Sequence, residues 1–437
     1  MGMNDLSRRA TLTATRAEPR QQETRRQPAR SGPFGVLDIG STKISCLIGR
    51  AESDGRLRAL GFGWQRGRGV KSGGIVDLED AEKAIRAAVG AAEDQADMRL
   101  KSVTVNLSCG QPESRLFNVQ WPIDGRAVTE DDIRRVVREA RARAASEGRG
   151  TIHALPLNFS TDETGGVADP RGLYCDTLTA QLHVVDAATT AIKSVTACLE
   201  RCELEIASMV SAPFASGLAT LVEDERELGA TVIDMGGGTT TIAVFAEGQM
   251  LHTAQLPVGG NHVTNDVARL LSTQVAHAER LKTLYGTCQE SPDDARELLP
   301  VPLVGEAEHQ IAKVPRSALV SIIRPRLEEI FELVRDRIET SGLGRAAGAR
   351  VVLTGGASQL VGARELAAQI LDRQVRIGKP IGVIGLPDAA TGPNFATMIG
   401  LLAFASGDGQ TMHDIDLTAA APQGRLARFM NLLMRRM

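Results

Sequence analysis

The sequence has few aromatic residues, almost no net charge and no long apolar run. Its 10 Phe, 2 Tyr and 2 Trp are too few for the stacking platforms that hold single-stranded nucleic acids. Its 50 basic and 53 acidic side chains give a formal net charge of −3, so the charge excess of a nucleic-acid-binding protein is missing. No stretch approaches the roughly 20 apolar residues that cross a bilayer. A length of 437 residues with 43% hydrophobic residues predicts a globular chain of two or more domains.

Cysteines are also few, and their spacing is not that of metal ligands. The six are Cys46, Cys109, Cys175, Cys198, Cys202 and Cys288. We expect small buried thiols in a reducing compartment. Residues 1–32 carry seven arginines, three acids and almost no large apolar residue, which predicts a disordered tail. The chain start has no apolar core of a signal peptide, although a transit peptide is an alternative.

Two segments repeat one pattern, in which an apolar run, an Asp and a glycine-rich turn with hydroxyl side chains precede a second apolar run. They are GVLDIGSTKISCLIG at 35–49 and ATVIDMGGGTTTIAVF at 230–245, and they suggest two related domains that face each other. Glycine turns let backbone N–H groups approach phosphate, and an Asp at a strand end can hold hydrated Mg²⁺. Either segment alone would equally suit an ordinary hairpin, but the pair favours a phosphate site. The candidate residues are Asp38, Gly40, Ser41, Thr42, Lys43, Asp234, Gly236, Gly237, Gly238, Thr239 and Thr240, with Asp38 and Asp234 for Mg²⁺ held through water.

A third glycine-rich turn, VVLTGGASQLVG at 351–362, follows an apolar strand and opens a helical pattern. Gly355, Gly356 and Ala357 could lie there against a flat ring or a phosphate. Two hairpins followed by such a turn resemble the superfamily of actin, Hsp70 and the sugar kinases. The resemblance implies an α/β, two-domain ATP-binding fold of duplicated ribonuclease H-like domains, with ATP and Mg²⁺ as cofactors. It also implies two connecting helices, at 211–217 and 394–400, whose small residues permit close crossing.

Two further positions bear on how such a site would work. Glu279 and Lys282 lie three apart on a predicted helix, where a surface ion pair is the ordinary interpretation. An E-x-x-K at this place reaches the ribose and base in actin-like proteins, so the resemblance implies that role here. Hydrolysing relatives carry Glu or Gln where this chain has Ala212, just before Pro213. Alanine cannot orient an attacking water, so we expect ATP binding with slow hydrolysis at most and name no catalytic residue.

An inserted α+β module is predicted after the first hairpin, over residues 102–187. Its expected elements are strands at 102–108, 116–122, 151–159 and 177–185 and a helix at 129–145 capped by Thr129. The insertion resembles the 1C subdomain that the FtsA family of bacterial cell-division proteins carries in place of actin's subdomain 1B. The I-I-x-P-R-x-x-E-I core within 301–342 resembles the same family. The family docks the C-terminal tail of the tubulin-like protein FtsZ there, which implies Arg316 and Arg326 as contacts, unless they are solvated helix-face arginines.

The C-terminal residues 424–437 form a basic amphipathic pattern after a polar linker at 406–423. At about 100° per residue, the large apolar side chains fall within about 140° and the arginines within about 100° on the other side. The apolar residues are Leu426, Phe429, Met430, Leu433, Met434 and Met437, and the basic ones are Arg425, Arg428, Arg435 and Arg436. Such a helix could cover its own domain. FtsA proteins end in this way with a membrane-targeting helix, which the resemblance implies here.

The resemblance to FtsA thus covers about residues 33–405 and the tail. It implies an ATP-binding protein that polymerises head to tail, tethers FtsZ to the cytoplasmic face of the inner membrane at the division site, and binds further division proteins through the insert. A pilus-assembly adaptor similar to FtsA is the alternative, and sugar kinases and chaperones fit less well. The expected parts are domain 1A (33–101 and 188–229), 1C (102–187), 2A (230–262 and 345–405), 2B (263–344), the linker (406–423) and the terminal helix (424–437).

Overall fold

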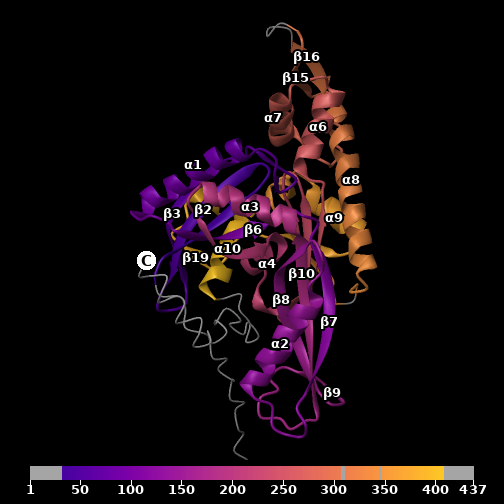
Figure 1. Ribbon diagram of the computed structural model, residues 1–437. Helices are drawn as coiled ribbons and strands as arrows, with labels where there is room; N and C mark the ends of the chain where they lie inside the picture. The colour runs from indigo at the N-terminus through magenta and orange to yellow at the C-terminus, as the bar shows by residue number, and fades with distance from the viewer. Residues whose placement is uncertain (1–31, 307–310, 345, 408–437) are drawn as a thin grey trace, which may run out of the picture.

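The computed structural model describes residues 32–306, 311–344 and 346–407 (Figure 1). Nearly all of the Arg-rich leader, the linker beyond Gly407 and the C-terminal amphipathic segment lie outside these residues. Within the described residues, no helix combines the length and the apolar character needed to cross a membrane. All six cysteines are buried free thiols, as the sequence predicts.

The first domain is built on a six-stranded sheet with the order β11-β6-β1-β2-β3-β19. β1 pairs antiparallel with β2 and parallel with β6, and every residue of β1 is buried. Apart from Asp38 near its end, its residues are apolar on both faces because α1 and α10 cover the sheet from opposite sides. The strands are β1 (Phe34–Ile39), β2 (Lys43–Ala51), β3 (Leu57–Arg66), β6 (Ser102–Leu107), β11 (Glu205–Ser211) and β19 (Val383–Ile384), with the short pair β4 (Val70–Lys71) and β5 (Gly74–Ile75) and the helices α1 (Leu78–Ala96) and α3 (Thr189–Arg201).

The second domain repeats the centre of this arrangement in a five-stranded sheet with the order β14-β13-β12-β17-β18. β12 pairs antiparallel with β13 and parallel with β17, as β1 does with β2 and β6. The predicted duplication is therefore confirmed in the topology. The elements are α5 (Glu223–Leu228), β12 (Ala230–Met235), β13 (Thr240–Ala246), β14 (Gln249–Leu256), β17 (Arg350–Thr354), α9 (Ala363–Leu371) and β18 (Gln374–Ile377), with short 3₁₀ turns at Gly356–Gln359, Asp388–Ala390 and Pro393–Phe395.

A small subdomain stands on the second domain and shares its core. Figure 1 shows it at the upper end of the molecule, with α8 running down its side. Buried residues of α8 such as Leu327 and Phe331 belong to one cluster with Ile242 and Val244 of the sheet. The elements are α6 (Gly260–Leu270), α7 (Val275–Tyr285), β15 (Leu298–Pro302), β16 (Ile311–Pro315) and α8 (Arg316–Thr340).

The inserted module has its own sheet, with the order β7-β10-β8-β9, and its own core beneath α2. Its elements are β7 (Glu113–Pro122), α2 (Glu130–Ala144), β8 (Arg149–Thr161), β9 (Thr164–Val167) and β10 (Thr177–Ala188). Thr129 caps α2 in a reciprocal capping box with Asp132, as its position before the acidic first turn predicts. β9 escaped prediction because its sequence TGGV has no alternating apolar pattern.

Two expected domain boundaries are wrong. β6 pairs with β1 and β11, so residues 102–107 belong to the first domain and the insert starts after them. At the other end, β19 pairs with β3, and α10 (Ala396–Ser406) packs on β1 and β2, so the last part of 345–405 returns to the first domain. Both errors have one cause: local pattern identifies a strand but not the sheet that it joins.

The predicted connecting helices are α4 (Ala212–Thr220) and α10, which pack closely against each other. A Cβ at Gly400 would lie 1.7 Å from the carbonyl oxygen of Ala215, so no larger residue fits without moving a backbone. A Cβ at Gly217 would likewise lie 2.3 Å from a ring carbon of Phe245 in the second domain. The small residues of these helices therefore fix the approach of the two domains.

Gly400→Ala should destabilise the protein by about 2–3 kcal/mol, because the added methyl overpacks the crossing. Gly90→Ala in α1 is the matched control, since a Cβ there meets nothing within 4 Å and alanine favours a helix by about 1 kcal/mol. Thermal unfolding of both variants checks this. A Gly400→Ala midpoint equal to that of Gly90→Ala would contradict the close crossing.

Candidate functional site

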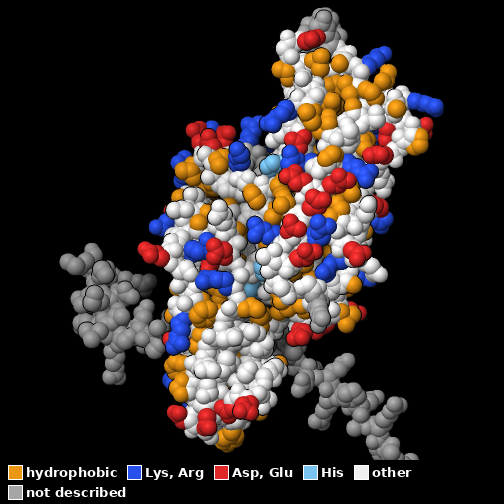
Figure 2. Space-filling model, turned by 90° about the vertical axis from the view of Figure 1, so that its right-hand side faces the viewer, with side chains coloured by type: hydrophobic (Ala, Val, Ile, Leu, Met, Phe, Trp, Pro, Cys, Tyr) orange, Lys and Arg blue, Asp and Glu red, His pale blue; other side chains and the backbone are white. Residues whose placement is uncertain are grey.

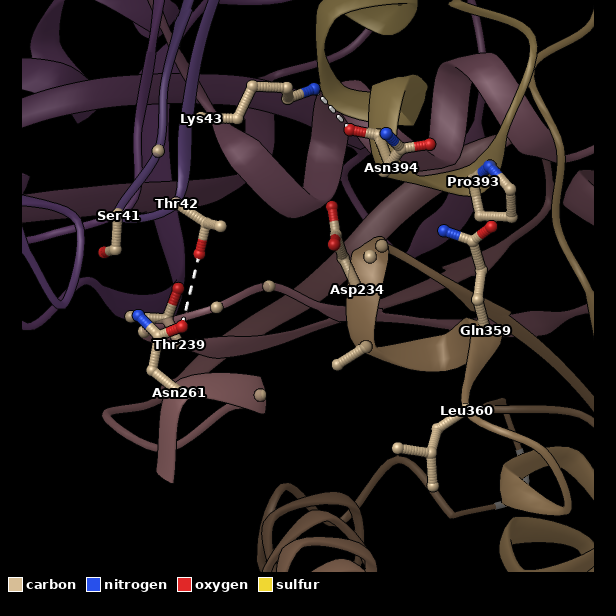
Figure 3. A pocket seen from close by; sticks show the side chains of 18 of the residues that line it. Ser41, Thr42, Lys43, Asp234, Thr239, Asn261, Gln359, Leu360, Pro393 and Asn394 are labelled. Atoms are coloured by element: carbon tan, nitrogen blue, oxygen red, sulfur yellow. Dashed lines mark hydrogen bonds between the residues drawn. The ribbon is translucent and has the colours of Figure 1, made fainter. Parts of the chain in front are cut away.

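A cavity of about 560 Å³ lies between the two domains, within the size range of small-molecule sites. The two hairpin turns, the third glycine-rich turn and α7 all contribute to its wall, and Figure 3 shows the residues from both domains facing one another. Of the residues predicted from sequence, the lining includes Asp38, Gly40, Ser41, Thr42, Lys43, Asp234, Gly236, Gly237, Gly238, Thr239, Glu279, Lys282, Gly355, Gly356 and Ala357. Segments more than 300 residues apart thus meet in one place.

The two hairpin turns touch across the cavity. A Cβ at Gly237 would lie 1.8 Å from Oγ1 of Thr42, so the second turn must be glycine to pass the first at this distance. The Thr42 hydroxyl also donates to Oδ1 of Asn261, at the start of α6, over 3.4 Å (Figure 3). Backbone N–H groups of both turns are thereby concentrated around a small volume, which suits an anion with several oxygens.

Burial opposes the charges of the first hairpin. It raises the pKa of Asp38 to about 6, although the nearby Lys43 ammonium acts in the opposite direction. It lowers the pKa of Lys43 to about 8, against the attraction of Asp38 at 3.8 Å. Lys43 Nζ donates to the carbonyl oxygen of Asn394 over 2.5 Å and lies 3.5 Å from the ring centroid of Phe395. The lysine thus links the first hairpin to the start of α10.

Asp234 is held by both connecting helices. Its Oδ2 accepts hydrogen bonds from Ser216 of α4, at 2.5 Å, and from Thr397 of α10, at 2.9 Å. Burial raises the pKa of Asp234, and these two hydrogen bonds and Lys43 counteract it. The helix crossing that joins the domains therefore also fixes the carboxylate that points into the cavity (Figure 3).

On α7, Glu279 and Lys282 form an ion pair of 2.7 Å at the cavity wall. Thr264 of α6 donates to Glu279 over 2.5 Å, and Lys282 donates to the Thr264 hydroxyl over 2.9 Å. Burial disfavours the Glu279 carboxylate, but the Lys282 charge and these hydrogen bonds outweigh it and hold its pKa below the usual range. Glu279 and Lys282 thus form the i,i+3 ion pair that is ordinary for such spacing, and both residues also line the cavity.

Thr240 is the one predicted lining residue whose side chain points elsewhere. Its hydroxyl donates to the carbonyl oxygen of Val258 over 2.8 Å, whereas Thr239 and Thr241 line the cavity. Side chains alternate along β13, so the side chain of Thr241 faces the cavity and that of Thr240 does not, contrary to the prediction. Ala212 does line the cavity and brings no polar group to it.

Several lining residues were missed from sequence. They are Asn106, Ser108, Asn261, Gln359, Asn394 and Thr397. Asn106 follows the apolar run of β6, and a polar residue at a strand end was a usable signal. Its side chain accepts from the N–H of Ile39 over 2.7 Å and so fixes the end of β1. Asn261 and Gln359 carry no local signal, because only the tertiary fold brings them to the cavity.

Comparison with known proteins identifies the family. The family description "Cell division protein FtsA" matches residues 231–400, and "SHS2 domain inserted in FTSA" matches residues 109–186. The cell division protein FtsA of Agrobacterium fabrum is 45% identical over 402 residues, which are 90% of each chain. That of Escherichia coli K12 is 33% identical over 375 residues, 84% of this chain and 89% of the relative. The chain belongs to the FtsA family.

Solved structures agree with the actin-like fold of this FtsA-family chain. The PilM-PilN type IV pilus biogenesis complex matches with a TM-score of 0.59 at 18% identity, over 85% of this chain and 98% of the other. MreB5 of Spiroplasma citri bound to ADP matches with a TM-score of 0.52 at 13% identity, over 87% and 98%. The expected actin-like two-domain fold with a 1C-type insert is confirmed, and the family match of the insert begins at 109, after β6.

The two arginines expected at the partner surface of the FtsA small subdomain are already paired. Arg316 donates to Glu297 over 3.0 Å and to the carbonyl oxygen of Tyr285 over 3.2 Å. Arg326 donates to Asp266 through Nε over 2.6 Å. Neither is a free, solvated charge, which sequence alone could not show.

Exposed apolar side chains are the more prominent feature of this subdomain. Figure 2 shows them gathered at the upper end of the molecule, where Figure 1 places α6, α7, β15 and β16. Those at least half exposed are Leu270, Val275, Leu284, Leu298, Val304 and Ile311. The expected membrane-binding residues, Arg425, Leu426, Arg428, Phe429, Met430, Leu433, Arg435, Arg436 and Met437, lie outside the described residues.

Proposed function

We propose that this FtsA-family protein binds ATP with Mg²⁺ in the cavity and tethers FtsZ polymers to the cytoplasmic membrane during cell division. The observation that carries the nucleotide part is the convergence of two hairpin turns, a third glycine turn and the Glu279–Lys282 pair on one cavity. Both domains supply parts of that wall, and the second domain with its small subdomain supplies the larger share. A ligand that contacts both would favour a closed arrangement, so the nucleotide acts as a clamp between domains.

The residues fit the parts of a nucleotide. Backbone N–H groups of the hairpin turns and Lys43 would hold the phosphates, and Asp38 and Asp234 would hold Mg²⁺ through water. Glu279 and Lys282 would meet the ribose and base, with Gly355, Gly356 and Ala357 behind the adenosine. Mg²⁺ supplies charge neutralisation of the phosphates. Because Ala212 brings no group that orients water, hydrolysis would be slow.

The proposed tether has two ends. The exposed apolar surface of the small subdomain would take the FtsZ C-terminal tail, with Arg316 and Arg326 in supporting roles. The basic amphipathic segment 424–437 would bind the membrane, since each arginine near an anionic leaflet contributes ~1 kcal/mol and each buried large apolar side chain ~1.5–3 kcal/mol. One such helix anchors weakly, so head-to-tail filaments would multiply the attachment. Further division proteins would dock on the insert.

A pilus-assembly adaptor is the alternative, and the likeness to PilM supports only its fold. Relatives at 33% to 45% identity over most of the chain are named cell division proteins, which favours the division role. The basic amphipathic tail favours it as well.

Asp234→Asn should weaken Mg-ATP binding at least tenfold, because it removes a charge needed by Mg²⁺ while keeping an acceptor for Ser216 and Thr397. Asp336→Asn, on the exposed surface of α8, is the matched control and should bind like the wild type. Isothermal titration with and without Mg²⁺ measures this. Wild-type affinity of Asp234→Asn in Mg²⁺ would remove the second hairpin from the site.

Mg-ATP affinity should be greatest between about pH 6 and pH 8, the pKa values of Asp38 and Lys43. Above about pH 8, Lys43 loses the proton that attracts phosphate; below about pH 6, Asp38 gains a proton and no longer attracts Mg²⁺. Lys43→Met should abolish the alkaline fall alone. The acid fall also contains the titration of the phosphate itself, with a pKa of about 6, and both proteins share it. An alkaline fall that persists in Lys43→Met would contradict the assignment.

Deletion of residues 425–437 should abolish co-sedimentation with vesicles of anionic lipid, whereas deletion of residues 2–31 should not. A fluorescent FtsZ tail peptide should co-sediment with vesicles only when the intact protein is present. Val275→Asp with Leu284→Asp should lose the peptide but keep the vesicles, and Leu228→Asp, at a still more exposed position outside the small subdomain, should keep both. Unchanged vesicle binding without the tail would contradict the anchor.

A further inference from the structure

The insert is joined to the first domain through one narrow neck. The entering strand leaves β6 through Ser108 to Gln111, and the leaving strand β10 passes directly into α3. The two are tied where the N–H of Ala188 donates to the carbonyl oxygen of Gly110 over 2.9 Å. Gly110 has φ +76° and Gln111 has φ +49°, so two successive residues are left-handed at this point. A sharp, local turn of this kind is where a rigid module can pivot.

Strand β14 of the second domain forms hydrogen bonds to the connecting segment on both sides of Gly110. Gln255 Nε2 donates to the carbonyl oxygen of Ser108, a residue of the cavity wall, over 2.6 Å. Two residues earlier on β14, the backbone N–H of Thr253 donates to Oγ of Ser114 over 3.2 Å. Ser114 lies on β7, inside the insert, and its hydroxyl is 2.6 Å from Nε2 of the fully buried His183 on β10.

The root of the insert is also part of the core between the domains. Leu155 of β8 packs against the cluster that contains Phe245 and Met250 of the second domain. His153 of β8 accepts a hydrogen bond from the N–H of Ser211 over 2.9 Å, immediately before Ala212 in the cavity wall. By contrast, the outer part of the insert has a separate core under α2. The root of the insert therefore contacts both domains: β8 packs on β11 and α3 of the first domain, and β7 and β10 meet β14 of the second.

We infer that the insert moves with the second domain, pivoting at Gly110 and Gln111, when the cleft between the domains opens or closes. The contacts through Thr253, Ser114, His183 and Leu155 would carry it. This inference rests on the proposed nucleotide function for its physiological trigger: ATP bound between the hairpins would change the orientation of the insert relative to the first domain. Any partner docked on the insert would then sense the nucleotide state.

Distances between paired spin labels test this. Labels on introduced cysteines at Lys83 (first domain), Glu163 (tip of the insert) and Glu339 (second domain) are selective, because the six native thiols are buried. On addition of Mg-ATP, the 83–339 and 83–163 distances should change together, and the 163–339 distance should not. An unchanged 83–163 distance with a changed 163–339 distance would show that the insert follows the first domain and would overturn the inference. The inference would also be overturned if titration shows that ATP is bound and none of the three distances changes.

A second comparison needs no nucleotide, so it separates failure of this inference from failure of ATP binding. Ser114→Ala with Gln255→Met removes both hydrogen bonds from β14, the one to Ser114 and the one to the carbonyl of Ser108. This double variant should broaden the 163–339 distance distribution of the nucleotide-free protein. Ser194→Ala with Gln120→Met makes the same chemical changes at exposed positions away from β14 and should leave the width unchanged. Equal widths in the two double variants would overturn the inference, whatever the outcome with ATP.

Discussion

Where α4 crosses α10, Gly400 lies so close to the carbonyl of Ala215 that the two helices, and with them the two domains, have one permitted approach. The same helices hold Asp234 through Ser216 and Thr397. The crossing therefore sets both the distance between the hairpins and the direction of a carboxylate in the cavity. Thr42 and Gly237 come into contact as a consequence, and both hairpin turns line the cavity between the domains.

Electrostatics at the cavity follow from that close packing. Asp38, Lys43 and Asp234 share a buried space. Burial raises the pKa of both aspartates and lowers the pKa of the lysine, which favours the neutral form of each group. Lys43 is stabilised by the Asn394 carbonyl and the Phe395 ring, both at the start of α10. Such groups gain from a ligand of opposite charge, because it restores the interactions that water would otherwise supply. The phosphate chain and Mg²⁺ that we propose for this cavity would match both signs.

Much of this was predictable from sequence where the signal is local. The Asp and glycine turns, the small residues of α4 and α10 and the Thr129 cap are each encoded within a few residues, and the structure places them as expected. The direction of the Thr240 side chain was not predictable in this way, because three successive threonines give the same local signal. Nor was the sheet that β6 joins, because the sequence of a strand does not specify the strand with which it pairs. Asn261 and the pairing of Arg326 with Asp266 depend on contacts between distant segments, which no local pattern specifies.

The central claim is that one nucleotide is held by both domains at once, and an experimental structure with a non-hydrolysable ATP analogue and Mg²⁺ tests it most directly. The account predicts phosphate oxygens in contact with N–H groups of both hairpins, and the adenosine between the Glu279–Lys282 pair and the Gly355–Gly356 turn. An analogue bound to one hairpin alone, or outside this cavity, would contradict it.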